Sequence, residues 1–149
     1  MEFIVKSFDQ LTTSELYAVL QLRSEVFVVE QDCVYQDIDG NDQKAIHVLG
    51  YKNNQLIAYT RLFKPADYYE YASIGRVIVK QGERKYGYGH DLIRFSINTV
   101  QKEFSTKMIK IGAQTYLRKF YESHGFQKVG EDYIEDGIPH IYMIREYFI

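Results

Sequence analysis

Hydrophobic positions recur with two different periods in the first part of the chain, and these periods predict a strand followed by a helix. Apolar and polar residues alternate over residues 3–8 (FIVKSF), which predicts a first β-strand. Over residues 11–31 the apolar positions follow a helical period, as in a helix packed on a sheet. Thr12 and Glu15 form the S/T-x-x-E pattern of a capping box, which sets the helix start near Thr12. The stripe that would face the sheet consists of Leu16, Leu20, Arg23 and Phe27, with Val19, Leu22 and Val26 beside it.

The middle of the chain holds three β-rich runs. Residues 46–51 (IHVLGY) and 55–63 (QLIAYTRLF) are separated by Lys52-Asn53-Asn54, which predicts a hairpin. Residues 72–79 (ASIGRVIV) are apolar on both sides toward their end. That pattern is typical of a central strand covered on both faces.

Helical spacing returns after this strand and is followed by a further alternation of strands and a short helix. Apolar residues then follow the i, i+4, i+7, i+11 spacing of an amphipathic helix. They are Ile93, Ile97, Val100 and Phe104. The remaining elements are a strand at 108–114 (MIKIGAQ), a short helix within 116–125 (YLRKFYESHG) that ends at Gly125, and two strands around an Asp136-Gly137 turn.

The element order is therefore β, α, β, β, β, α, β, α, β, β. It predicts an α/β (α+β) fold in which helices cover both faces of a mixed central β-sheet. The segment from Ala72 to Gln114 reads strand, glycine loop, helix, strand, and needs a right-handed crossover between parallel strands. No linker or repeat divides the chain, so we expect a single domain over residues 1–149.

Composition narrows the function classes. The chain has 18 Lys and Arg against 20 Asp and Glu, a formal charge of -2, which is not the basic footprint of a nucleic-acid-binding protein. Cys33 is the only cysteine, so no disulfide forms within the chain, and no His or Cys grouping suggests a metal site. We find neither a signal peptide nor an apolar run long enough to span a membrane, and we expect a cytoplasmic protein.

The polar segment QDIDGNDQK resembles a calcium-binding loop at first sight. Asp37, Asp39 and Asn41 have the spacing of the first three ligands. The sixth position is Asp42, where glycine is needed, and the twelfth is Val48, where a chelating glutamate should stand. We therefore reject a calcium site and expect a solvated turn.

The segment RKYGYGHDLI carries two closely spaced glycines between the expected central strand and a helix. Backbone N–H groups and the positive end of the helix dipole meet at such a point and attract phosphate. Gly87 and Gly89 allow close approach or a positive φ, and Arg84 and Lys85 add positive charge. The string matches no Walker loop, and a dinucleotide fingerprint would need a small residue at Leu92.

What the loop does match is R-x-x-G-x-G, formed by Arg84, Lys85, Tyr86, Gly87, Tyr88 and Gly89. Taken alone, this string is also compatible with a plain glycine-rich turn before a helix. A second motif, KFYESHGF (residues 119–126), follows after a helix and a strand. In this order the two motifs resemble the GCN5-related N-acetyltransferases (GNAT), whose pyrophosphate loop and F-Y-x-x-x-G-F helix they match. More narrowly, LQLRSEVFVVEQ, YQDIDGND, IGRVIV and EDGIPHI resemble the ElaA-like branch, so the resemblance runs from Leu16 to about Ile144.

The resemblance implies a GNAT domain that uses acetyl-CoA as a co-substrate and needs no metal. Acetyl-CoA would lie in a splay between the strands at 74–79 and 108–114. The N–H groups of Arg84 to Gly89 would hold its pyrophosphate. The main chain of Val77, Ile78 and Val79 would pair with the pantetheine arm, and the Val79 N–H would stabilise the oxyanion.

The resemblance also implies candidate catalytic groups for acetyl transfer to a primary amine. Tyr121, at the tyrosine of F-Y-x-x-x-G-F, would be the general acid, because a phenol of pKa about 10 is protonated at neutral pH. Glu30 and His140 are the candidate bases or acceptor contacts, with Glu70 a weaker alternative. His47 and His124 are expected to be structural.

Two functions stay open at this point. The first is an N-acetyltransferase acting by direct attack of a small-molecule or protein amine, and the alternative is a non-catalytic acyl-CoA-binding or regulatory domain on the same fold. The acids at Asp37, Asp39 and Asp42 suggest a cationic acceptor, although a solvated loop explains them equally well. The aromatic C-terminal run IYMIREYFI is a candidate strand or edge for a homodimer.

Overall fold

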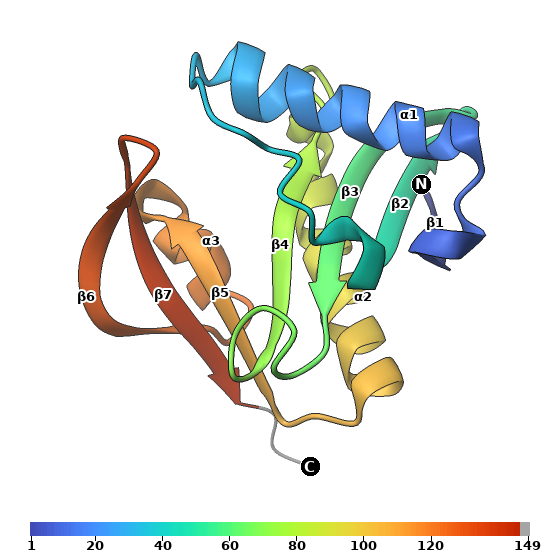
Figure 1. Cartoon of the computed structure of the whole chain (residues 1–149). Coiled ribbons are helices and arrows are strands. Elements are labelled where there is room, and N and C mark those ends of the chain that lie inside the picture. Colours follow the sequence, from blue (N-terminus) through green and yellow to red (C-terminus); the bar gives the residue numbers. More distant parts are fainter. Residues whose placement is uncertain (147–149) are drawn as a thin grey trace.

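Seven strands form one mixed sheet in the computed structural model of the chain, which describes residues 1–146 (Figure 1). The sheet has the order β1-β2-β3-β4-β5-β7-β6. Only β4 and β5 run parallel, and every other neighbouring pair is antiparallel. The strands are β1 (Glu2–Ser7), β2 (Ile46–Lys52), β3 (Gln55–Phe63), β4 (Ala72–Val79), β5 (Met108–Gln114), β6 (Gln127–Glu135) and β7 (Ile138–Glu146).

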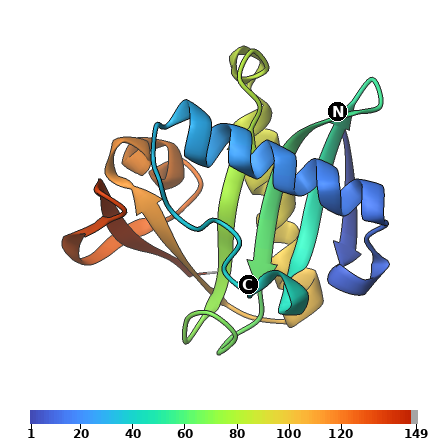
Figure 2. The same cartoon turned by 45° about the horizontal axis from the view of Figure 1, so that its top comes forward.

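Helices cover both faces of this sheet, as predicted. The helices are α1 (Thr13–Arg23), α2 (Tyr88–Phe104) and α3 (Arg118–Glu122). α1 crosses one face, where its apolar side chains pack against β2, β3 and β4, while α2 and α3 pack with the larger apolar cluster on the other face (Figures 1 and 2). Within residues 1–146 no helix has the length and hydrophobicity that a membrane span requires.

The first helix differs in part from its prediction. The capping box is present, because Thr12 Oγ1 accepts from the Glu15 N–H and Glu15 Oε1 accepts from the Thr12 N–H. The helix then widens into a π-helical segment, Ser24–Glu30. The fully buried stripe is not the predicted one. Leu16 and Leu20, which lie before the π-helical segment, are only half-buried. The buried positions are Val19, Leu22, Arg23 and Val26.

A β-bulge in β4 reverses which side chains face α2. Opposite β3, Tyr59 pairs with Ile78 but Arg61 pairs with Gly75, so β4 carries an extra residue between them. Arg76 sits in this bulge with φ +49°. Before the bulge Ile74 belongs to the α2 face, and after it Val77 does. The strand prediction is confirmed, but simple alternation could not locate this switch.

The segment 31–45, which we call the strap, buries two acidic side chains where a solvated turn was expected. Asp37 and Asp42 are only 7% and 6% exposed. Asp37 binds Arg23 (2.9 Å) and Arg76 (2.7 Å), and Asp42 binds Arg23 (2.7 Å). Because buried charges must be paired, these acids draw the strap onto the sheet, and the solvated-turn prediction is wrong.

Candidate functional site

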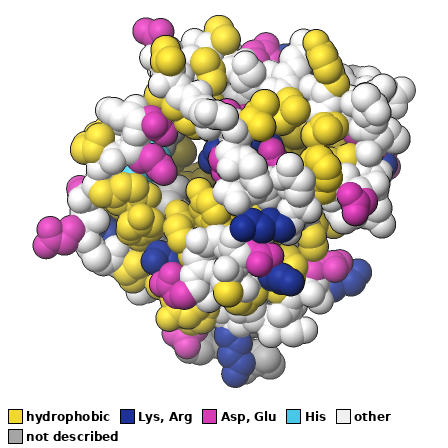
Figure 3. Space-filling view, viewed as in Figure 1, with side chains coloured by type: hydrophobic (Ala, Val, Ile, Leu, Met, Phe, Trp, Pro, Cys, Tyr) yellow, Lys and Arg dark blue, Asp and Glu magenta, His cyan; other side chains and the backbone are white. Residues whose placement is uncertain are grey.

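The parallel strands β4 and β5 separate soon after they begin, and the gap between them is the centre of a large cavity. They pair only at Ala72 with Ile109 and at Ser73 with Lys110. Beyond these pairs the strands diverge, and a cavity of about 870 Å³ lies between them. Figure 3 shows a hollow on the α1 face, with hydrophobic side chains around it and acidic side chains and a histidine at its edge. Main-chain groups of β4 that would otherwise pair with β5 are therefore available to a ligand.

The predicted glycine loop forms one end of this cavity. Gly87 has φ +75°, a left-handed conformation that glycine adopts without steric cost, and α2 begins at the next residue. Gly89 lies in the first turn of α2, where a Cβ would touch the Phe120 ring at 3.6 Å. N–H groups in the first turn of a helix have no partner within the helix. The loop therefore presents donors and the positive end of the α2 dipole to the cavity.

The Arg84 side chain ties this loop to two other elements. Its Nε donates to the Val79 carbonyl at 2.9 Å, and its two terminal nitrogens donate to the Glu30 carboxylate at 2.7 and 2.8 Å. Both Glu30 oxygens are thus occupied. The Val79 carbonyl already accepts one of these bonds, so the N–H of Val79 is the group best placed to bind a ligand.

Two tyrosines of the glycine loop contact Lys52, a residue that was not among the predicted site residues. Lys52, at the end of β2, places its Nζ over the Tyr86 ring at 4.2 Å and over the Tyr88 ring at 5.2 Å. Lys85 also lies near Tyr86, with its Nζ 5.3 Å from the ring centroid. The sequence predicts the hairpin that carries Lys52 but not this contact, because Lys52 and the glycine loop are far apart along the chain.

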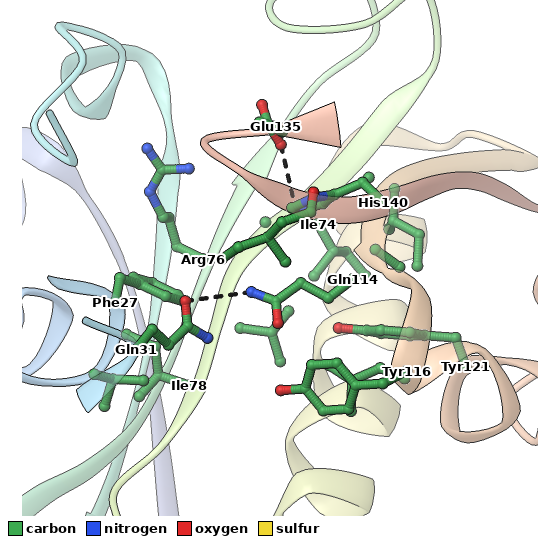
Figure 4. A pocket seen from close by; sticks show the side chains of 18 of the residues that line it. Phe27, Gln31, Ile74, Arg76, Ile78, Gln114, Tyr116, Tyr121, Glu135 and His140 are labelled. Atoms are coloured by element: carbon green, nitrogen blue, oxygen red, sulfur yellow. Dashed lines mark hydrogen bonds and ion pairs between the residues drawn. The ribbon is translucent and has the colours of Figure 1, made fainter. Parts of the chain in front are cut away.

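Tyr121 reaches the cavity from the α2 and α3 face of the sheet. Its residue exposure is only 5%, and it packs in the main apolar cluster. Burial raises the pKa of its phenol, which keeps the hydroxyl protonated. The hydroxyl points into the cavity and has no hydrogen-bond partner within residues 1–146 (Figure 4). The Tyr121 hydroxyl is therefore a protonated donor that faces the cavity.

His140 reaches the cavity from the opposite face. It lies directly across the ladder from Gln114, so their side chains share one face, and the residue is 8% exposed. Its Nδ1 is 2.7 Å from the Ile138 carbonyl, which can only accept, so Nδ1 carries the proton. In the neutral ring Nε2 then keeps its lone pair, and it lies 3.5 Å from Glu135 Oε2.

Two glutamines that sequence reasoning missed meet between these groups. The Gln114 amide donates to the Gln31 side-chain oxygen at 3.3 Å, which links the end of β5 to the strap. In Figure 4 Gln114 lies between Tyr121 and Tyr116 on one side and His140 and Glu135 on the other. Nothing in the sequence marks Gln114 as a site residue, whereas Gln31 and Glu135 belong to the LQLRSEVFVVEQ and EDGIPHI strings that carry the resemblance.

The remaining candidates lie away from the reacting groups or serve the framework. Glu70 is outside the cavity lining and pairs with Lys110 at 3.1 Å. His47 is buried and bonded to the Tyr59 hydroxyl, in keeping with a structural role. His124 contacts His90 beside the glycine loop, with 2.8 Å between ring nitrogens. The described residues contain no cluster of three or more His, Cys, Asp or Glu side chains suited to a metal.

The splayed parallel strands, the glycine loop at a helix start and the cavity between the strands are features of the fold of acyl-CoA-dependent acyltransferases. A family model of the acetyltransferase (GNAT) domain matches residues 10–147. The chain therefore belongs to the GNAT acetyltransferase family, in its ElaA-like branch.

Three known proteins illustrate the relationship. Protein ElaA of Escherichia coli (strain K12) is 49% identical over 140 residues, 93% of this chain and 92% of ElaA, and its crystal structure matches with TM-score 0.91 over 97% and 99% of the two chains. An acyl-CoA N-acyltransferase from Pseudomonas aeruginosa is 39% identical, with TM-score 0.91 over 97% of this chain and 99% of that one. An aminoglycoside 6′-N-acetyltransferase solved with coenzyme A shares the fold at 16% identity, with TM-score 0.70 and 96% of each chain covered.

Proposed function

We propose that the protein transfers an acetyl group from acetyl-CoA to a primary amine of a small molecule or protein by direct attack. The observation that carries this proposal is the Tyr121 hydroxyl, a buried, protonated donor that points without a partner into the cavity. A protein that only bound acyl-CoA would have no need for a proton donor at this position of the cavity. The likeness to an acyl-CoA N-acyltransferase at 39% identity supports the choice of donor.

Acetyl-CoA would occupy the splay from the glycine loop inward. The N–H groups of Arg84, Lys85, Tyr86, Gly87, Tyr88 and Gly89 would hold the pyrophosphate. Residues Val77, Ile78 and Val79 would pair with the pantetheine arm along the side of β4 that β5 leaves open. The Val79 N–H would then donate to the thioester oxygen as negative charge develops there.

The transfer needs three proton movements. The amine nitrogen attacks the thioester carbonyl and the C–N bond forms; the nitrogen then releases its second proton to water as the C–S bond breaks and the thiolate of CoA leaves. Tyr121 donates its proton to that thiolate, whose conjugate thiol has a pKa of about 8–9. Before attack the acceptor ammonium loses one proton to a base on the acceptor side. Tyr121 regains its proton from solvent after the products leave.

His140 is the base that we propose, because its Nε2 keeps a lone pair on the acceptor side of the cavity, where it would take the proton from the entering ammonium before the free amine moves past Gln114 to the thioester. Glu30 stays a candidate as well, but its carboxylate would first have to release Arg84. The pH dependence of kcat/KM distinguishes His140 from Glu30 as the base. A His base gives a kcat/KM that rises through the pKa of a histidine, about 6.5 when unperturbed.

The experiment that tests the function compares Tyr121→Phe with Tyr116→Phe. Both changes remove one phenol oxygen from the cavity lining, but Tyr116 is 74% exposed whereas Tyr121 is buried. We expect Tyr121→Phe to lower kcat by about 100-fold or more while acetyl-CoA binding by calorimetry changes little. Tyr116→Phe should keep most activity.

Two results would contradict this proposal. If the wild type binds acetyl-CoA but releases no CoA thiol with a broad panel of amines, the non-catalytic acyl-CoA-binding alternative is favoured. If acetyl-CoA neither binds nor raises the melting temperature, both functions fail, because a ligand at 100 times its Kd adds about 2.7 kcal/mol of stability.

A further inference from the structure

The cavity has an acceptor end, which opens on the α1 face and is lined by Tyr35, Arg76, Glu135, Asp136 and His140. It lies across the sheet from Tyr121. Gln114 separates the two ends, and in Figure 4 Glu135 and His140 lie beyond it from Tyr121. A molecule reacting near Tyr121 therefore reaches Glu135 only with a part remote from its reacting nitrogen.

The acids of the strap contribute no net charge to this end. Asp37, Asp39 and Asp42 are matched by Arg23, Arg61 and Arg76 in one buried network. Arg76, the cation that lines the acceptor end, holds Asp37 at 2.7 Å and lies 3.5 Å from Asp39. These three aspartates therefore give no reason to expect a cationic acceptor.

The negative charge of the acceptor end comes instead from the β6–β7 turn. Glu135 and Asp136 are carboxylates of the cavity lining that have no Lys or Arg partner within residues 1–146. The partner of Glu135 is the His140 ring, 3.5 Å away, and Asp136 lends only its main-chain oxygen to Cys33. Glu30, at the other end of the lining, is neutralised by Arg84.

We propose that the acceptor is a primary amine that carries a second positive charge, and that Glu135 and Asp136 bind this second charge. This inference rests on the proposed acetyl transfer and names its substrate class. The reacting amine passes Gln114 toward the buried Tyr121 hydroxyl, while the remote ammonium stays at the two carboxylates. Carboxylates at the rim of a partly enclosed cavity attract cations and disfavour anions.

Chain-matched amines test the proposal. The probes are 1,6-diaminohexane, hexylamine and 6-aminohexanoate, whose remote ends are cationic, neutral and anionic, together with a terminally blocked Lys-Lys dipeptide. Each is titrated calorimetrically into the CoA-saturated protein, and kcat/KM is measured with acetyl-CoA. We expect the diamine to bind about tenfold more tightly than hexylamine, and the amino acid most weakly. A preference for the dipeptide over the diamine would identify lysines of peptides as the acceptor amines.

The variant Glu135→Gln/Asp136→Asn should reduce the diamine preference to about one, whereas Asp132→Asn should leave it intact. Asp132 lies on the same strand but outside the cavity lining, and pairs with Lys128. Each result is a ratio between two amines on one protein, so a general loss of activity or folded fraction cancels. The proposal is overturned if the double variant keeps the wild-type preference for the diamine, or if the wild type shows no such preference. Preferential binding without CoA release would instead refute the acetyl transfer and leave this cation site standing.

Discussion

The charge of Asp42 should be one of the largest single contributions to the stability of this protein. Its Oδ1 accepts from Arg23 at 2.7 Å and from Arg61 at 3.0 Å. Those two arginines are 0% and 1% exposed. Removing one partner of a buried ion pair costs about 3–5 kcal/mol, because the remaining charge stays buried without compensation. We therefore expect Asp42→Asn, which keeps the shape but not the charge, to cost about 3 kcal/mol.

Urea unfolding followed by circular dichroism measures this loss. With an m-value of about 1–3 kcal/mol/M, a loss of 3 kcal/mol lowers the midpoint by about 1–3 M. The matched control is Asp132→Asn, which removes the same charge from a carboxylate that is 59% exposed and should cost less than about 1 kcal/mol. If both variants lose the same small amount, Asp42 behaves as a solvated loop residue and the reasoning about the buried network is refuted.

Three further predictions follow from particular contacts. Although burial opposes it, the hydrogen bonds from Arg23 and Arg61 lower the pKa of Asp42, so its stabilisation is complete above about pH 4 and is lost as the pH falls further. The difference in unfolding free energy between wild type and Asp42→Asn should accordingly be constant above about pH 4 and narrow as the pH falls below this value. Gly87→Val places a β-branched residue at φ +75°, which costs about 1–3 kcal/mol, and calorimetry should show weaker CoA binding. Glu30→Gln should change the KM for acetyl-CoA by less than about tenfold and largely preserve kcat, because the ion pair of Glu30 with Arg84 is partly exposed. A fall in kcat of about 100-fold would instead identify Glu30 as the base.

Local patterns were sufficient for most elements because each depends on nearby residues. The capping box at Thr12 and the hairpin turn at Asn53 and Asn54, which adopt φ +51° and +63°, are decided within a few positions. The glycine loop could be predicted for the same reason, because the strand before it and the helix after it are its direct neighbours in the sequence. A resemblance to one family then placed Tyr121 in the same cavity as that loop.

The burial of the strap acids could not be predicted from local patterns. Asp37 and Asp42 look like solvated turn residues because their partners are remote in sequence, with Arg76 lying 39 residues from Asp37. Whether an acid is buried depends on whether a cation meets it in space, and periodicity carries no such information. The bulge at Arg76 is hidden for the same reason, since it appears only as a slip in pairing with β3. The predicted dimer role of the C-terminal run falls partly on residues 147–149, outside the described residues.

The proposed acetyl-CoA site and the acceptor end are built from different parts of the chain. This difference explains why the sequence indicated the residues of the first and not those of the second. Acetyl-CoA would contact the glycine loop, the β4 backbone and Tyr121, which all belong to one continuous segment, residues 77–121. The acceptor end combines side chains from the strap, the β4 bulge and the β6–β7 turn. Substitutions at Glu135 or Asp136 can thus change acceptor choice without touching the groups proposed to hold acetyl-CoA. Acceptor preference should therefore differ between members of this family that keep the same glycine loop.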